Sequence, residues 1–198
     1  MSDYFLCYKP FEVLSQFTSE AGKRSLKEIA EVPVDVYPVG RLDYDSEGLL
    51  LLTNDKTINH RLLHPSYQHE REYWVQVEGT ITEQALSLLR EGVIISNEGK
   101  KEKTKKCEAY LFEEEPQLPE RYPPIRFRKN IPTSWIRLII REGKNRQVRK
   151  MTAAAGFPTL RLVRWRIEQL TIEGMLPGDL KVLQQEQVTR ALFGRLPG

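Results

Sequence analysis

The sequence is poor in cysteine and histidine, and it lacks the long apolar runs of membrane proteins. Its apolar runs, of which Leu49–Leu52 with its neighbours is the most prominent, fall far short of the roughly 20 residues that a membrane helix needs. The N-terminal residues do not show a basic region, an apolar core and a small-residue cleavage site in succession, which argues against secretion. Cys7 and Cys107 are far apart and lack metal-ligand spacing. We therefore expect two buried, reduced thiols in a cytoplasmic protein.

Several signatures of common enzyme classes are also missing. His60 and His64 are four residues apart, but Arg61 follows the first histidine where a zinc protease needs glutamate. No phosphate-binding G-x-x-x-x-G-K-[ST] loop precedes the apolar strand at Leu49–Leu52, and no G-x-S-x-G nucleophile motif occurs. These absences argue against zinc proteolysis, nucleotide hydrolysis and serine-esterase chemistry.

Positive charge is concentrated in one part of the chain. The formal net charge is +3, yet residues 1–120 hold 14 Lys/Arg against 22 Asp/Glu, whereas residues 121–166 hold 13 Lys/Arg against the single acid Glu142. A basic block of this density is typical of polyanion-binding surfaces. Some aromatic residues of the block belong to the core, and others could stack on unpaired bases. We therefore expect a nucleic-acid partner.

The stretch Gly40–Gly48 is the most unusual in the chain. It packs three acids and Arg41 between two glycines, and it leads directly into the leucines of Leu49–Leu52. A polar loop joined to a buried strand can hold charged groups rigidly at the rim of a core. A solvated acidic turn between two strands is the alternative interpretation.

Hydrophobic patterning predicts more strands than helices. Predicted strands cover residues 4–8, 36–39, 49–53, 71–79, 107–112, 134–140 and 160–170, and predicted helices cover 25–30, 54–63, 82–90 and 145–155. The charged segment 100–106 is expected to be a loop, and the proline-rich segment 113–132 a lobe boundary or surface arm. Because the strands follow one another without strict β-α-β alternation, the fold class is α+β with a mixed, largely antiparallel sheet and flanking helices.

A second polar cluster opens the predicted helix after residue 145. Arg146, Arg149 and Lys150 crowd one face of its first turns, and Asn145 is the expected N-cap. Cations near a helix N-terminus oppose the helix macrodipole. Their presence despite this cost favours a functional role.

Three segments together resemble the ribosomal RNA pseudouridine synthases of the RsuA family. Gly40–Asn54 is similar to their catalytic motif, Arg71–Val77 to their tyrosine motif and Glu142–Met151 to their basic third motif, in the same order and spacing. Residues 123–135 and 156–162 are similar to a branch of this family that modifies RNA of the large ribosomal subunit.

The resemblance extends from about Tyr4 to Leu183, and it implies both a fold and a reaction. It implies one catalytic domain over residues 1–198, with two lobes around a central cleft and without the N-terminal S4-type RNA-binding domain of many relatives. It further implies a monomeric cytoplasmic enzyme that isomerises one uridine of ribosomal RNA, most specifically 23S RNA of the large subunit, to pseudouridine. Because this reaction involves no redox change and no phosphate chemistry, neither a cofactor nor a metal is expected.

The resemblance also implies residue roles. Asp43 matches the catalytic aspartate, Tyr73 the tyrosine that lies against the target base, and Arg149 the basic residue that pairs with the aspartate. Asp43 would attack C1′ of the ribose or remove a ribose proton to give a glycal, and both routes stay open. Asp45 and Glu47 are interpreted as acids that fix the loop by accepting backbone N–H bonds, or that face solvent. The other residues expected to contact RNA are Arg41, Arg126, Arg128, Lys129, Lys144, Arg146, Lys150, Arg161 and Arg164.

The competing hypothesis is a non-catalytic RNA-binding ribosome-assembly factor with the same fold. The complete set of Asp43, Tyr73 and Arg149 argues against it, since a binding protein does not need a carboxylate facing its anionic ligand. A glycosidase would need a second carboxylate across a sugar cleft, and the basic block does not suit neutral sugars.

Overall fold

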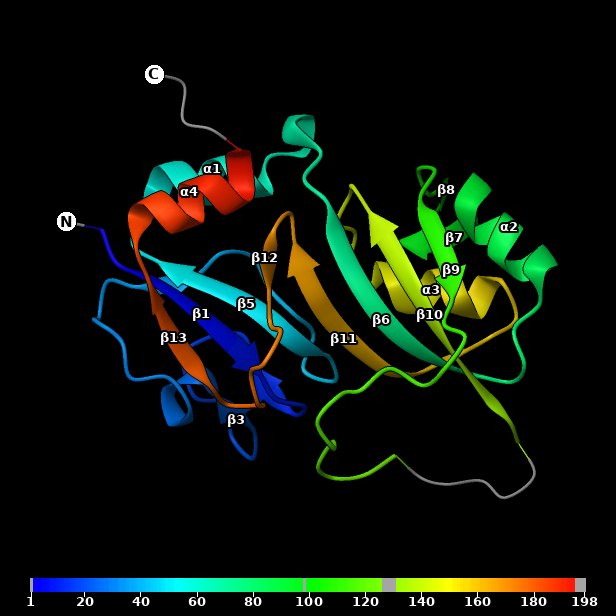
Figure 1. Cartoon of the computed structure of the whole chain (residues 1–198), viewed down its shortest axis with the longest axis horizontal. Helices are drawn as coiled ribbons and strands as arrows, with labels where there is room; N and C mark the ends of the chain where they lie inside the picture. Colours follow the sequence, from blue (N-terminus) through cyan, green and yellow to red (C-terminus); the bar gives the residue numbers. More distant parts are fainter. Residues whose placement is uncertain (1, 98, 126–130, 195–198) are drawn as a thin grey trace. The chain divides into compact units, whose positions relative to one another are not determined.

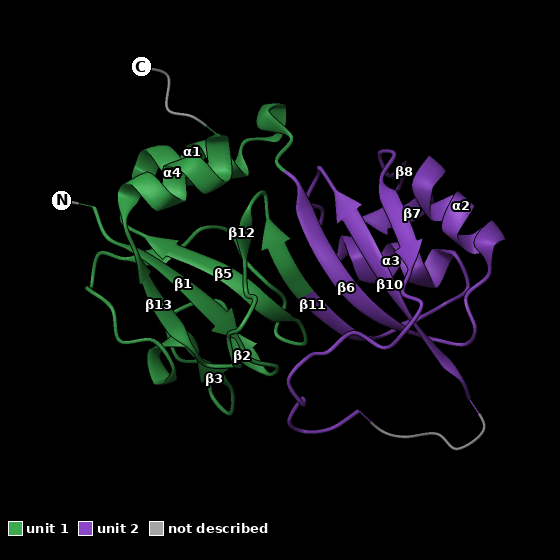
Figure 2. Cartoon of the chain, viewed as in Figure 1, with its two compact units in different colours: residues 1–69, 164–198 green, residues 70–163 purple. Residues whose placement is uncertain are grey.

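The computed structural model describes residues 2–97, 99–125 and 131–194 of the chain, and Figure 1 shows their helices and strands. They form two compact units, one of residues 1–69 and 164–198 (unit 1) and one of residues 70–163 (unit 2), coloured separately in Figure 2. The chain passes from unit 2 back to unit 1 within strand β11 (Thr159–Ile167).

The division does not fall where the sequence suggested it. The proline-rich segment 113–132 lies inside unit 2 rather than at its border. The reason is that the strands on either side of it, β9 (Glu108–Leu111) and β10 (Thr133–Ile140), pair with each other in antiparallel fashion. The segment is therefore a long connection between neighbouring strands of one unit.

The sheet of unit 1 is built around the leucine strand. In spatial order its strands are β13 (Leu180–Leu183), β1 (Tyr4–Lys9) and β5 (Glu47–Thr53), with β4 (Tyr37–Pro38) also paired to β5. The pairings are antiparallel, and Cys7 lies opposite Leu50. Every residue of β5 is buried, which confirms that the apolar run forms a strand covered on both faces.

The remaining elements of unit 1 cover this sheet. They are β2 (Val13–Leu14), β3 (Arg24–Ser25), the 3-10 helices η1 (Leu26–Glu28) and η2 (Pro65–Tyr67), α1 (Lys56–Leu63), β12 (Leu170–Thr171) and α4 (Gln185–Phe193). On one face Phe5 and Cys7 pack with Leu50, Leu52 and the apolar side chains of the β2–β4 region. Helices α1 and α4 lie side by side (Figure 1), and the Arg61 guanidinium is 3.8 Å from the ring centroid of Phe193.

Unit 2 contains a second antiparallel arrangement. Its strands run in the order β6 (Arg71–Glu78), β10 and β9, and its other elements are α2 (Glu83–Glu91), β7 (Ile94–Asn97), β8 (Lys100–Lys103) and α3 (Gln147–Ala154). The predicted alternation of β6 is confirmed, because Tyr73, Val75 and Val77 are all buried. Helix α2 begins as predicted, with the Thr82 hydroxyl accepting a hydrogen bond from the Ala85 amide at 3.2 Å.

The prediction of a loop at residues 100–106 is wrong. Residues 100–103 form β8, which pairs antiparallel with β7. Ile95 of β7 is buried, and Thr104 closes the hairpin by accepting from and donating to the backbone of Val93. A run of lysines is compatible with a strand when its outer face meets solvent. The predicted α+β class with a mixed, largely antiparallel sheet is confirmed, and β2 and β3 supply a parallel pairing.

Candidate active site

The acidic loop of unit 1 holds Asp43 on a fixed backbone. The Ser15 hydroxyl donates to the Leu42 carbonyl at 2.8 Å and accepts from the Leu42 amide at 3.0 Å. On the other side, the Ser46 amide donates to the Asp43 carbonyl at 3.0 Å. Both Ser15 and Ser46 are buried, whereas Asp43 itself is half-buried. The loop is thus ordered before any ligand arrives, which is what a catalytic carboxylate requires.

Gly48 anchors the end of this loop. Its φ of +108° is a backbone conformation that residues with a Cβ rarely adopt, and a Cβ here would lie 2.3 Å from the carbonyl oxygen of Arg164. Arg164 is itself buried and donates from Nε to the Leu49 carbonyl at 2.8 Å. The strand that carries the acidic loop is therefore pressed directly against the backbone at Arg164.

A buried lysine beneath the loop was missed by the sequence reasoning. Lys9, the last residue of β1, has no exposed surface, and its Nζ donates to the carbonyls of Pro10 at 2.9 Å and Val13 at 2.7 Å. Burial lowers the pKa of Lys9 to about 7, while the nearby carboxylates of Glu47 and Asp43 act in the opposite direction. Glu47 is 1% exposed, which agrees with its interpretation as a loop-fixing acid.

Tyr73 lies in unit 2, near the start of β6. It stands opposite Leu138 of β10 and is 9% exposed. Val75 and Val77, the next residues on the same face of β6, are fully buried, so the ring of Tyr73 lies at the end of a row of apolar side chains. An aromatic ring fixed in this way has the rigidity that base stacking requires.

Arg149 lies on α3 of unit 2, and the loop before this helix is closed by a glutamine. Gln147 is buried, donates from Nε2 to Glu142 at 2.6 Å and accepts from the Lys144 amide at 3.0 Å. The helix starts at Gln147 with Arg146 as N-cap at φ +51°, so the prediction of Asn145 as N-cap is wrong. The side-chain amide of Gln147 thus hydrogen-bonds both Lys144 and Glu142 of this loop, whereas Asn145 is exposed.

The residues expected to contact RNA differ in how far the structure exposes them. Arg41 and Arg146 are exposed, whereas Lys144 and Lys150 are half-buried, with Lys144 Nζ 2.6 Å from Glu102 Oε2. Arg161 and Arg164 are buried, which sets them apart from a phosphate-binding surface. Three further residues, Arg126, Arg128 and Lys129, lie outside the described residues.

The two buried arginines, Arg161 and Arg164, donate hydrogen bonds to backbone carbonyls inside the protein. Arg161 is 7% exposed and donates to the Pro119 carbonyl at 2.8 Å, and Arg164 is 4% exposed and bonds Leu49 as described above. We therefore remove both from the expected RNA surface. Composition alone could not distinguish a buried guanidinium from an exposed one.

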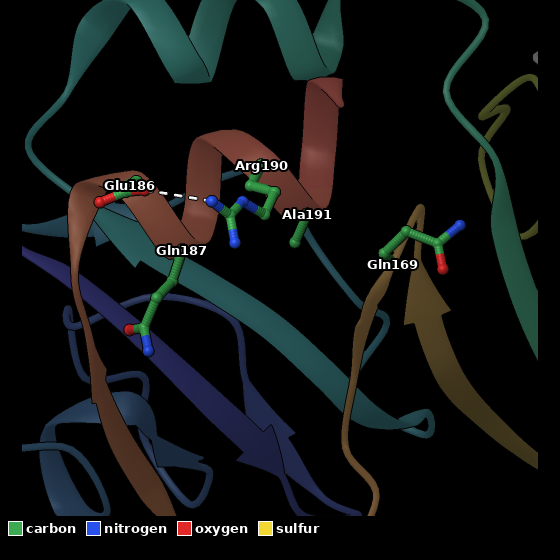
Figure 3. Close-up of a pocket in the computed structure, with 5 residues that line it drawn as sticks. All are labelled: Gln169, Glu186, Gln187, Arg190 and Ala191. Carbon is green, nitrogen blue, oxygen red and sulfur yellow. Dashed lines mark hydrogen bonds and ion pairs between the residues drawn. The ribbon is translucent and has the colours of Figure 1, made fainter. Parts of the chain in front are cut away.

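Unit 1 also contains a surface hollow of about 590 Å³ at α4. Figure 3 shows its lining residues, where Arg190 bonds Glu186 at 3.2 Å next to Gln187, Ala191 and Gln169. None of the predicted site residues lines it. The described residues contain no group of three or more His, Cys, Asp or Glu that could hold a metal ion. Among the helices that they form, none is long and apolar enough to cross a membrane.

Comparisons with known proteins agree with these features. The family model described as RNA pseudouridylate synthase matches residues 3–154. The chain is 47% identical over 173 residues to ribosomal large subunit pseudouridine synthase E of Vibrio vulnificus, covering 87% of this chain and 71% of the relative. It is 49% identical over 172 residues to the protein of the same name from Xanthomonas axonopodis pv. citri, covering 83% and 88%. A solved structure described as a pseudouridylate synthase superposes with a TM-score of 0.76 at 26% identity, covering 97% of this chain and 74% of that one.

Proposed function

The chain belongs to the RNA pseudouridylate synthase family and is an rRNA pseudouridine synthase, and we propose that its target is one uridine of 23S rRNA in the large ribosomal subunit. The choice of the large subunit is supported by the two relatives that share nearly half of its residues. The observation that carries the proposal of a site is the fixed loop around Asp43, within the matched residues 3–154.

The reaction is an isomerisation. The N1–C1′ bond of the target uridine breaks, the uracil turns, C5 bonds to C1′, the hydrogen at C5 leaves to solvent and N1 is protonated. The target base must leave its stack to reach protein side chains, and unstacking costs a few kcal/mol. Binding energy from the RNA around the target offsets this cost, so the basic residues outside the reacting centre contribute to turnover.

We assign Asp43 as the catalytic carboxylate, acting on the ribose as nucleophile or as base. Tyr73 would lie against the base, and Arg149 would pair with Asp43 and hold it ionised and oriented. Asp43 belongs to unit 1, whereas Tyr73 and Arg149 belong to unit 2, so the pairing stays a prediction. Arg41 and Arg146, both exposed, support the proposal of an RNA-binding surface. That the protein acts as a monomer also stays a prediction.

Release of tritium tests the reaction. RNA labelled with tritium at uracil C5 should lose label to water when incubated with the protein alone, because C5 exchanges its hydrogen for C1′. The RNA should stay intact, and no free uracil should appear. Free uridine should be inert, since it offers nothing that the basic surface can hold.

The control is Asp43→Asn, which keeps the shape of the side chain and removes its charge. Label release from the wild type but not from this variant supports both the reaction and the assigned residue. Free uracil would indicate a glycosylase instead. A folded protein that binds ribosomal RNA and releases no label would favour the assembly-factor hypothesis.

A further inference from the structure

The β7–β8 hairpin of unit 2 carries a surplus of lysines to which no role has been assigned above. Residues 94–106 contain five lysines and two glutamates. The lysine side chains are all exposed, and they are Lys100, Lys101, Lys103, Lys105 and Lys106. Lys106 pairs with Glu91 at 2.9 Å. The other four form no ion pair with any residue of the described part of the chain.

The antiparallel pairing divides the hairpin into two faces. Ile95 lies opposite Glu102, and because Ile95 is 2% exposed this face points inward. Side chains alternate along a strand, so the neighbouring pairs point outward. These outward pairs are Ile94 with Lys103 and Ser96 with Lys101, and all four side chains are exposed.

The inward face ties the hairpin to helix α3, which lies against β7. Glu102 Oε2 is 2.6 Å from Lys144 Nζ, and Asn97 Oδ1 is 3.4 Å from Lys150 Nζ. Glu102 thus balances a cation of the α3 segment on the inner side. The outward lysines keep their charge without such a partner, beside the helix that carries Arg149.

We propose that Lys101 and Lys103 on the outward face of this hairpin, together with Lys100, which lies opposite Asn97 at the tip and is also exposed, bind the sugar–phosphate backbone of the rRNA substrate. The inference rests on the proposed function, because it takes RNA as the ligand. Lysine is depleted in protein–protein interfaces, and such interfaces are anchored by aromatic residues, of which this face has none. Flexible ammonium groups and a serine hydroxyl instead suit phosphate oxygens, which supply most of the salt-dependent affinity for nucleic acids.

The test is the salt dependence of RNA binding by a triple variant, Lys100→Gln, Lys101→Gln and Lys103→Gln. Affinity for an rRNA fragment that the wild type modifies is measured between about 50 and 200 mM salt, because affinity that comes from phosphate contacts falls steeply over this range. The slope of log affinity against log salt should become shallower by about 0.7–0.9 for each phosphate that the variant no longer neutralises, so by roughly 2 to 3 in total. Turnover at saturating RNA should fall by less than the affinity does, because none of the three residues contacts the reacting atoms while binding energy from the surrounding RNA still helps to unstack the target base.

A matched control removes the same charge from unit 1. Lys27, Lys56 and Lys181 are also exposed, and their joint replacement by glutamine changes the net charge equally. This control should keep the wild-type slope.

The outcomes separate this inference from the function on which it rests. If the wild type releases no tritium from any ribosomal RNA, the proposed function fails. If the wild type is active and the hairpin variant keeps the wild-type affinity and slope, or changes no more than the unit 1 control, the RNA-binding hairpin is refuted. Unchanged RNA binding is also the result expected if the hairpin docks an acidic protein.

Discussion

Replacing Lys9 by methionine should remove a dependence of stability on pH that the wild type shows near neutrality. Burial lowers the pKa of Lys9 to about 7, whereas an unfolded chain keeps it at the ordinary lysine value of 10.5. Between these values the unfolded chain binds a proton that the folded chain has released, so the free energy of unfolding rises with pH. Below pH 7 both states are protonated, and the contribution stays constant.

The magnitude follows from the size of this window. One proton of difference corresponds to about 1.4 kcal/mol per pH unit. From pH 7 to pH 8.5 the wild type should therefore gain about 2 kcal/mol relative to Lys9→Met. The series stops there because burial raises the pKa of Cys7 to about 12, and ionisation of that thiol in the unfolded chain would act in the opposite direction.

The assay is urea unfolding followed by circular dichroism at several values between pH 5.5 and pH 8.5. Lys181→Met provides the control, because Lys181 lies opposite Leu6 on the same sheet but is exposed. Its difference from the wild type should not change with pH. Parallel pH profiles of the wild type and Lys9→Met would refute the reasoning. A titration of the Lys9 amine by nitrogen NMR in the wild type gives the same answer if the variant fails to fold.

Three further predictions concern the site and its anchor. Asp43→Asn should abolish tritium release while RNA affinity stays within about threefold of the wild type, as measured by filter binding; turnover in this variant would assign the chemistry to another carboxylate. Arg149→Ala should lower turnover by at least about 100-fold and Arg149→Lys should restore part of it, because lysine lacks the bidentate fork; equal turnover in the alanine variant and the wild type would contradict the pairing. Gly48→Ala should cost more than about 2 kcal/mol beyond Gly22→Ala in urea unfolding, since both glycines have positive φ but only Gly48 meets the Arg164 backbone; equal costs would show that the close approach does not matter.

Local signals in the sequence were sufficient for the elements with clear periodicity or caps. The N-cap of α1 is Asp55, whose carboxylate accepts from the amides of Thr57 at 2.8 Å and Ile58 at 3.2 Å. The helix predicted over residues 54–63 is confirmed as α1 (Lys56–Leu63). The leucine run likewise forms a strand buried on both faces, because only burial can accommodate four successive leucines.

Tertiary contacts decided what the sequence could not reveal. Helix α4 (Gln185–Phe193) was not predicted, and its place is set by Phe193 packing under Arg61 and His69, residues more than a hundred positions earlier. Lys9 lay just beyond the strand predicted over residues 4–8, since Gly48, its partner on β5, and the carboxylates that act on its pKa lie more than thirty residues downstream. Arg161 was among the basic residues expected to contact RNA, and only the fold shows that its guanidinium bonds a backbone carbonyl.

Unit 1 is formed by two separate segments of the chain, so it cannot fold completely during translation until the second segment has been synthesised. Residues 70–163 are contiguous and emerge in one piece, whereas strand β1 must wait for its neighbour β13, which is synthesised after all of them. The backbone against which Gly48 is pressed, at Arg164, likewise appears more than a hundred residues after the acidic loop. The nascent chain therefore cannot complete the anchoring of the Asp43 loop until Arg164 has been synthesised, and a transcript truncated before Arg164 would encode the motif without its support.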